Sequence, residues 1–344
     1  MIFESRHSRN SLRFLFAGIL FIAAIVPDSR SATHRSPNSP APPAQQPLQV
    51  TTEIVKLDAA VTDDRGEFVG GLEQKNFKIL DRGLPQPIIF FTPTDAPAQI
   101  LVVVETSPAV YLIASDHIAA VYALASGLAP DDEVGLVAYD AVPRPILAFT
   151  QDKSSLAAAL RQIQYTLGFG ELNLFDSLSS VLDSLQQISG KKALVLLTTG
   201  LDSSPSSHRE ALLQKLRASD VVIFPVALGA PLRMSAKKTK DNELAASRET
   251  PVFAQADQVL RSLADLTGGR AFFPESAADF APMYREIAAT LRHQYVLGIA
   301  PAQDGQFHAL TVQILDSSGM PYPAAGKNIS RKVFVRQGYL APTS

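Results

Sequence analysis

Short apolar runs rich in β-branched residues alternate with segments of helical periodicity through the middle of the chain. Strands are predicted at residues 100–104, 133–139, 145–149, 193–198, 221–228 and 270–273. Helices are predicted at residues 109–126, 154–167, 174–188, 208–218, 255–266 and 277–292. Short strands that alternate with helices are typical of a mostly parallel sheet with helices on both faces, so we predict a Rossmann-like, doubly wound α/β domain.

The segments on both sides of this α/β part have the pattern of β structure. Residues 49–91 hold short strands separated by turns at residues 63–66, 70–72 and 81–83, and further strands are predicted at 294–299, 307–315 and 332–336. Neither group has enough strands to protect both edges of a sheet. We therefore predict one small β-sandwich built from both groups, with the α/β part inserted between them.

The N-terminal residues have the composition of an export signal. Arg6, Arg9 and Arg13 precede an apolar run at residues 14–26, which is shorter than the roughly 20 residues of an ordinary membrane-spanning helix. We predict a signal peptide at residues 1–31, with an uncleaved N-terminal anchor as the alternative. In either case the rest of the chain is expected to be exported, to the periplasm or the extracellular space.

These patterns divide the chain into five predicted parts. After the signal peptide, a Pro-rich linker covers residues 32–47 and the first sandwich strands cover residues 48–96. The α/β domain follows at residues 97–292, with a polar surface insertion at 230–254 where the periodicity stops. Residues 293–341 supply the remaining sandwich strands.

Composition narrows the classes of function. The chain is 46% hydrophobic, as a globular protein is, and its net charge of −2 gives no basic field for nucleic acid. It has no cysteine, which excludes disulfides, thiolate zinc sites and a cysteine nucleophile. The six histidines lack metal-ligand spacing, and there is no Gly-x-Ser-x-Gly elbow, so the sequence gives no positive evidence for an enzyme.

Polar residues follow the first strand of the α/β part, in the segment Glu105-Thr106-Ser107-Pro108-Ala109. Open α/β sheets bind ligands at the carboxyl ends of their strands. This segment resembles the first metal-binding loop of von Willebrand factor type A (vWA) domains, usually Asp-x-Ser-x-Ser. The motifs at residues 61–77, 294–298 and 336–339 look like those of exported vWA-related proteins of Acidobacteria, so the likeness spans about residues 48–341.

The resemblance implies a divalent cation held by three loops, but the ligand positions differ in each loop. Glu105 stands at the Asp position, Ser107 at the first Ser and Ala109 at the second, while Leu172 replaces the ligand Thr and Thr199 the ligand Asp. Mg²⁺ requires oxygen ligands in near-ideal octahedral geometry. We therefore expect no cofactor and a degenerate metal site, with weak Mg²⁺ or Ca²⁺ binding through rebuilt ligands as the alternative.

The resulting hypothesis is an exported, non-enzymatic adhesion or scaffold protein that binds a protein partner. Its binding edge is predicted to comprise residues from the three loops: Glu105, Ser107, Phe169, Glu171, Leu172, Thr199 and Asp202. We expect no nucleic-acid partner, and membrane contact only through the signal peptide or anchor. Two alternatives remain, a metal-dependent adhesion module with rebuilt ligands and, from another class, a hydrolase on a Rossmann-like sheet.

Overall fold

A computed structural model of the chain describes residues 54–107, 114–165, 170–203, 206–229, 250–322 and 331–343. The predicted signal peptide and linker and residues 230–249 of the predicted insertion lie outside this range, as do Ala109 and Phe169. Across the described helices, none combines the length and the apolar character needed to cross a membrane.

The central sheet has the order β7-β6-β5-β8-β9. Its strands are β5 (Ala98–Glu105), β6 (Glu133–Tyr139), β7 (Pro143–Thr150), β8 (Lys191–Thr198) and β9 (Val222–Ala227). All pairs are parallel except β6 with β7. The first strand in chain order lies centrally and the chain winds outward on both sides of it, so the prediction of a doubly wound sheet is confirmed.

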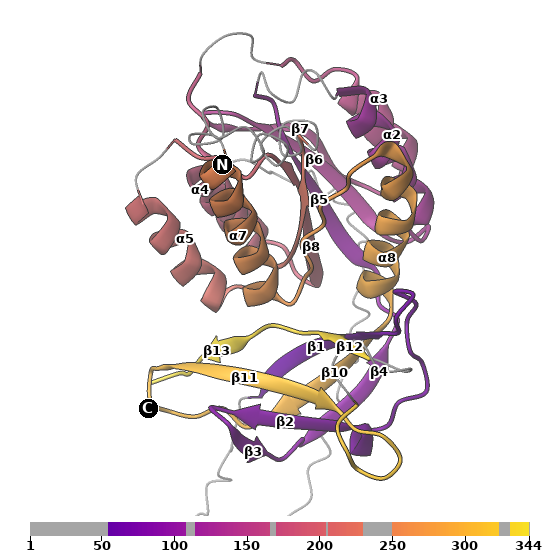
Figure 1. Ribbon diagram of the computed structural model, residues 1–344, viewed down its shortest axis with the longest axis vertical. Coiled ribbons are helices and arrows are strands. Elements are labelled where there is room, and N and C mark those ends of the chain that lie inside the picture. Colours follow the sequence, from indigo (N-terminus) through magenta and orange to yellow (C-terminus); the bar gives the residue numbers. More distant parts are fainter. Residues whose placement is uncertain are drawn as a thin grey trace, which may run out of the picture. The chain divides into compact units, whose positions relative to one another are not determined.

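Helices cover both faces of this sheet (Figure 1). One face carries α2 (Ala114–Gly127), α3 (Lys153–Leu160) and α8 (Phe280–Arg292), which follows the short 3-10 helix η3 (Ala277–Asp279). The other carries α4 (Leu174–Leu185), α5 (Ser206–Ala218) and α7 (Thr250–Thr267).

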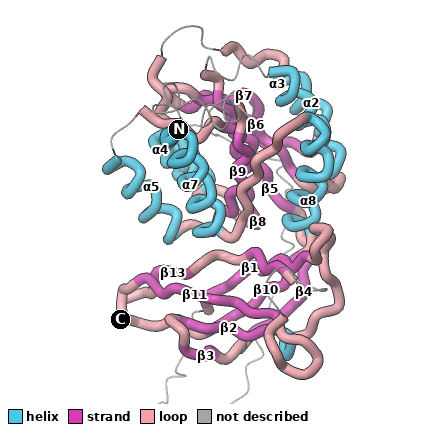
Figure 2. Tube along the Cα trace, in the orientation of Figure 1, coloured by secondary structure: helices cyan, strands magenta, loops and turns pink. Residues whose placement is uncertain are grey.

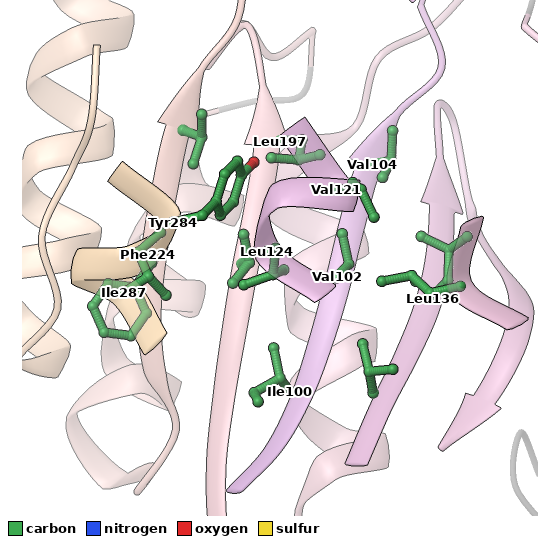
Figure 3. Close-up of a cluster of buried hydrophobic side chains, with 14 of the residues drawn as sticks. Ile100, Val102, Val104, Val121, Leu124, Leu136, Leu197, Phe224, Tyr284 and Ile287 are labelled. Carbon is green, nitrogen blue, oxygen red and sulfur yellow. The ribbon is translucent and has the colours of Figure 1, made fainter. Parts of the chain in front are cut away.

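Side chains of β5 alternate between the two cores, as the period of a strand requires. Ile100, Val102 and Val104 pack with Val121 and Tyr284 of α2 and α8 (Figure 3). The intervening side chains of β5 join the opposite core, beneath α4, α5 and α7. Both faces of the strand are therefore dry, which explains its nearly continuous apolar sequence.

The remaining strands form two four-stranded antiparallel sheets, of order β12-β1-β10-β4 and β13-β11-β2-β3. Their members are β1 (Val55–Thr62), β2 (Phe77–Asp81), β3 (Leu84–Gln86), β4 (Phe90–Thr94), β10 (Gln294–Ile299), β11 (Phe307–Ile314), β12 (Lys332–Phe334) and β13 (Gly338–Leu340). Both sheets combine strands from before and after the α/β part, which pair directly as β1 with β10 and β2 with β11. The predicted sandwich of N- and C-terminal strands is thus confirmed, and apart from the 3-10 helix η1 (Gln74–Asn76) its described elements are all strands (Figure 2).

Some element boundaries differ from the sequence prediction. The helix predicted at residues 154–167 ends at Leu160, because two i→i+3 bonds close the chain into a turn that buries Ile163 in the core. The predicted strand at 270–273 is reduced to one bridge between Phe272 and Val226. The three-residue strands β3 and β13 were not predicted, because they are too short to show a period.

Candidate functional site

The alternation of β5 continues past its apolar run and fixes the position of Glu105. Leu101 and Val103 face α4 and α7, so Glu105 points to the same side at the carboxyl end of the strand. Tyr139 is its register partner at the end of β6, and Thr198 ends β8 on the other side of β5. The strand order reverses between β5 and β8, the position where open α/β sheets bind ligands.

The Glu105 carboxylate is fully buried and surrounded by donors from three strand ends. Ser107 Oγ donates to Oε1 at 2.5 Å, and Thr198 Oγ1 donates to Oε2 at 2.8 Å. Thr199 donates twice, from its backbone N–H to Oε2 at 2.6 Å and from its hydroxyl, which lies 2.9 and 3.0 Å from the two oxygens. No lysine or arginine of the described residues forms an ion pair with Glu105, so hydrogen bonds compensate for its burial.

Tyr139 completes this buried network. Its hydroxyl lies 2.7 Å from Thr198 Oγ1 and 3.3 Å from Glu105 Oε2. Burial, followed by the nearby Glu105 charge, raises the pKa of Tyr139 well above its ordinary value, so the phenol stays protonated and acts as a donor. Thr198 Oγ1 also accepts from the Gly200 N–H at 2.9 Å. The tyrosine thereby fixes the hydroxyl that binds Glu105.

These residues do not fit a divalent cation. Both carboxylate oxygens of Glu105 already accept hydrogen bonds from the protein, and the Thr199 N–H cannot rotate away as a hydroxyl can. Leu172 offers no oxygen from its side chain, although a hard cation requires several oxygen ligands. The described residues contain no cluster of three or more acidic, histidine or cysteine side chains suited to a metal ion.

Polar contacts also join the second loop, which precedes α4 (residues 170–173), and the third loop, which follows β8 (residues 199–203). Ser203 Oγ donates to Leu172 O and accepts from Leu172 N, both at 2.9 Å. Asp202 Oδ2 accepts from the backbone N–H of Phe175 at 2.9 Å, in the first turn of α4. The Asp202 carboxylate therefore stabilises the N-terminus of this helix.

The structure corrects part of the predicted binding edge. Glu105 and Thr199 are fully buried and Ser107 is nearly so, so these three side chains are not available for contact with a partner. Glu171 is exposed, and Leu172 and Asp202 are partly exposed. The accessible edge therefore consists of the second and third loops above a closed polar layer.

Comparison with known proteins gives remote likenesses of fold. No family model matches the sequence, and no curated protein matches it either. A von Willebrand factor type A protein from Catenulispora acidiphila is 11% identical, with a TM-score of 0.45 over 84% of this chain and 75% of that one. The vWF domain of the type V pili tip protein Mfa5 from Porphyromonas gingivalis is 12% identical, with a TM-score of 0.43 over 58% and 97%. The conserved hypothetical protein BatB from Bacteroides thetaiotaomicron is 14% identical, with a TM-score of 0.41 over 56% and 98%.

The first turns of α4 and α5 bring together side chains that the sequence analysis did not select. His208 Nδ1 lies 2.8 Å from Asp176 Oδ2, and both side chains are substantially exposed. An Asp–His pair can orient a general base. In the described part of the chain, no hydroxyl is hydrogen-bonded to the His208 ring.

Arg144, on β7, forms a further polar contact at the same edge. Its guanidinium pairs with Asp140 at 2.5 Å and donates to Thr106 Oγ1 at 3.0 Å.

The alternation of side chains along β6 and β8 could have revealed Tyr139 and Thr198 from the sequence. Each of them continues the apolar face of its strand to the carboxyl edge of the sheet. No local pattern could have revealed the Asp176–His208 pair, because its members are 32 residues apart.

Proposed function

We propose that this chain is an exported, non-enzymatic protein whose sheet edge binds a protein partner without a metal ion. The observation that carries the proposal is the saturation of the buried Glu105 carboxylate by the donors of Ser107, Thr198 and Thr199. Where the vWA resemblance implies an ion open to a partner, this chain has a hydrogen-bonded layer that ties β5 to the end of β8.

Glutamate suits this layer because of its length. Its side chain is one methylene longer than that of aspartate, and both of its oxygens contact Thr199 on the neighbouring strand. The layer makes the edge rigid while the second and third loops remain accessible above it. A rigid base under accessible loops is suited to protein recognition, which depends on shape, hydrogen bonds and apolar contacts.

Calorimetric titration of the purified chain with Mg²⁺, Mn²⁺ and Ca²⁺ tests the independence from metal. We expect no saturable heat at millimolar concentrations. A micromolar isotherm that disappears in Glu105→Ala would contradict the proposal and favour a metal-dependent adhesion module.

Binding at the edge requires a separate test. The chain would be used to capture proteins from envelope extracts with and without a chelator, and any captured protein would then be purified and titrated. We expect binding that survives the chelator and weakens in Glu171→Lys, because Glu171 is an exposed residue of the second loop. Equal binding by the wild type and by this variant would argue against the edge. Glu105→Lys is unsuitable here, since burial of Glu105 makes unfolding the expected result.

A further inference from the structure

A pocket of about 210 Å³ opens beside the third loop, on the face of the central sheet that α4, α5 and α7 cover. Its apolar walls are formed by Phe175 of α4, Leu201 of the loop, and Val252 and Val259 of α7. Its polar groups are Asp202, Gln255 and Arg209, which lies in the first turn of α5. Three helices and one loop therefore converge on a cavity that is apolar inside and has polar groups beside it.

Small residues allow α7 to approach the third loop at this point. Gly200 has a φ of 77°, and a Cβ there would lie 3.1 Å from Leu260 and 3.2 Å from Ala256. Glycine is thus required both by the backbone conformation and by the packing of α7. Because Phe175 and Val259 are themselves buried in the core, the inner wall of the pocket belongs to the rigid part of the fold.

Arg209 is the cation of this pocket, and its guanidinium has no hydrogen-bond or ion-pair partner in the described part of the chain. Asp202 also lines the pocket, and its Oδ2 oxygen accepts from the Phe175 N–H at the start of α4. Arg209 is only partly exposed. A partly buried arginine next to apolar walls is a frequent feature of protein-binding surfaces and prefers a carboxylate.

The pocket is too small for a cofactor. Sites for drug-sized ligands and cofactors measure about 300–1,000 Å³, whereas this volume suits a single inserted side chain. The strongest contacts of protein interfaces are often single apolar side chains inserted into desolvated pockets. A small inorganic anion would satisfy Arg209 but would leave the walls of Phe175, Leu201 and Val259 uncovered.

We infer that this pocket is the anchor site for an acidic peptide segment of a protein partner. One apolar side chain of the segment enters between Phe175 and Val259, and a neighbouring Asp or Glu carboxylate pairs with Arg209. Gln255 can bind the peptide backbone, because its amide both donates and accepts. This inference rests on the proposed function and adds to it the chemistry of the partner.

Selection of a random peptide library against the purified chain tests the inference. We expect enrichment of sequences with an apolar residue next to Asp or Glu. A selected peptide should lose about tenfold to a hundredfold in affinity for Arg209→Glu, the range expected for a charge-assisted hydrogen bond. Arg285→Glu is the matched control, because Arg285 is exposed on α8 and this helix covers the opposite face of the sheet.

Two further measurements separate charge from shape. Replacing the acid of the peptide by its amide should weaken binding to the wild type but not to Arg209→Glu. Val252→Ser removes part of an exposed apolar wall without changing the charge, and should weaken binding with unchanged thermal stability. Selected peptides without an acid, or peptides that bind Arg209→Glu as tightly as the wild type, would overturn the inference.

The experiment also separates failure of the pocket from failure of the proposed function. If peptides bind the wild type, are lost in Glu171→Lys and are insensitive to Arg209→Glu, the edge binds proteins but the pocket is not the anchor. If no selected peptide depends on Glu171 or on Arg209, both proposals fail.

Discussion

The backbone N–H of Thr199 lies 2.6 Å from the Oε2 oxygen of Glu105 and joins the ends of two neighbouring parallel strands. A backbone donor at this position matters more than a hydroxyl, because it cannot turn away to admit another ligand. The contact therefore converts a loop that resembles a metal-binding loop into part of the sheet's own hydrogen-bonding network.

Removing this carboxylate should destabilise the fold. Glu105→Ala leaves the buried donors of Thr198, Thr199 and Ser107 without their acceptor, and we expect a loss of about 3 kcal/mol in the free energy of unfolding. Denaturant unfolding measures the change. Glu171→Ala is the control, since it removes the same side chain from an exposed position and should cost no more than about 0.5 kcal/mol. Equal costs for the two variants would show that the buried network contributes little.

Restoring the usual ligand types should create metal binding. We expect a chain with Glu105→Asp, Ala109→Ser, Leu172→Thr and Thr199→Asp to bind Mg²⁺ in a calorimetric titration, because its three loops then hold two carboxylates and, with Ser107, three hydroxyls. The same chain with Glu105 retained should bind more weakly, since the longer side chain still reaches the backbone N–H at position 199. Equal Mg²⁺ affinity with and without Glu105→Asp would show that the length of this side chain is unimportant.

The stability of the α/β domain should depend on pH through Lys191, at the start of β8. Burial lowers the pKa of Lys191 to about 8 from 10.5, and its ammonium group donates to the Leu291 carbonyl. Between these two pH values the unfolded chain binds more protons at this residue than the folded chain, so stability rises with pH. The cost of burying the charged ammonium is therefore complete below about pH 8 and is absent above about pH 10.5.

Lys191→Met provides the measurement, because methionine keeps the apolar stem and does not titrate. The free energy of unfolding of the wild type, relative to this variant, should increase by about 2–3 kcal/mol between pH 8 and pH 10.5. Well below pH 8, this difference in the free energy of unfolding should no longer change with pH. A difference that stays constant over the whole range would refute the assignment.

The sandwich should depend on a buried histidine. His308 Nδ1 lies 2.7 Å from Asp81 Oδ2, with both side chains buried, and the ring stacks on Tyr339. We expect His308→Phe to keep the stacking but to cost about 3 kcal/mol, because Asp81 loses its buried partner. Asp304→Asn is the control, since Asp304 contacts the other ring nitrogen from a more exposed position and should cost at most about 1 kcal/mol. Thermal and denaturant unfolding of both variants would check this order.

The sequence predicted the sheet well because β5, β6, β8 and β9 are buried along nearly their whole length. Leu101, Val103 and their neighbours form a run that no surface strand would tolerate, and the helices between such runs imply parallel pairing. The strands β3 and β13 could not be predicted, because three residues are too few to show an alternation of apolar and polar side chains. Residues Leu84-Pro85-Gln86 of β3 form a strand by pairing with β2. β13 depends in addition on pairing with β11, which lies far from it in sequence.

For the candidate site, the sequence pointed to the loop with Glu105 but not to the burial of its side chain. The loop with Glu105 was located from its position after a strand, whereas its burial depends on Tyr139 and Thr198, which β6 and β8 supply. Strand register brings these side chains together, and register is not visible within any one segment. Arg209 was missed for a related reason, because an arginine in the first turn of a helix gives no sequence signal until α7 and the third loop enclose it.

The pairing of Thr94 with Gln294 has a consequence for how such chains diversify. The inserted domain begins a few residues after one member of this pair and ends immediately before the other, so its entry and exit lie on a single rung of the β-ladder. Domains whose two ends lie close together are tolerated as insertions into a host fold. The sandwich can therefore accept a different inserted domain between Thr94 and Gln294, during evolution or by design.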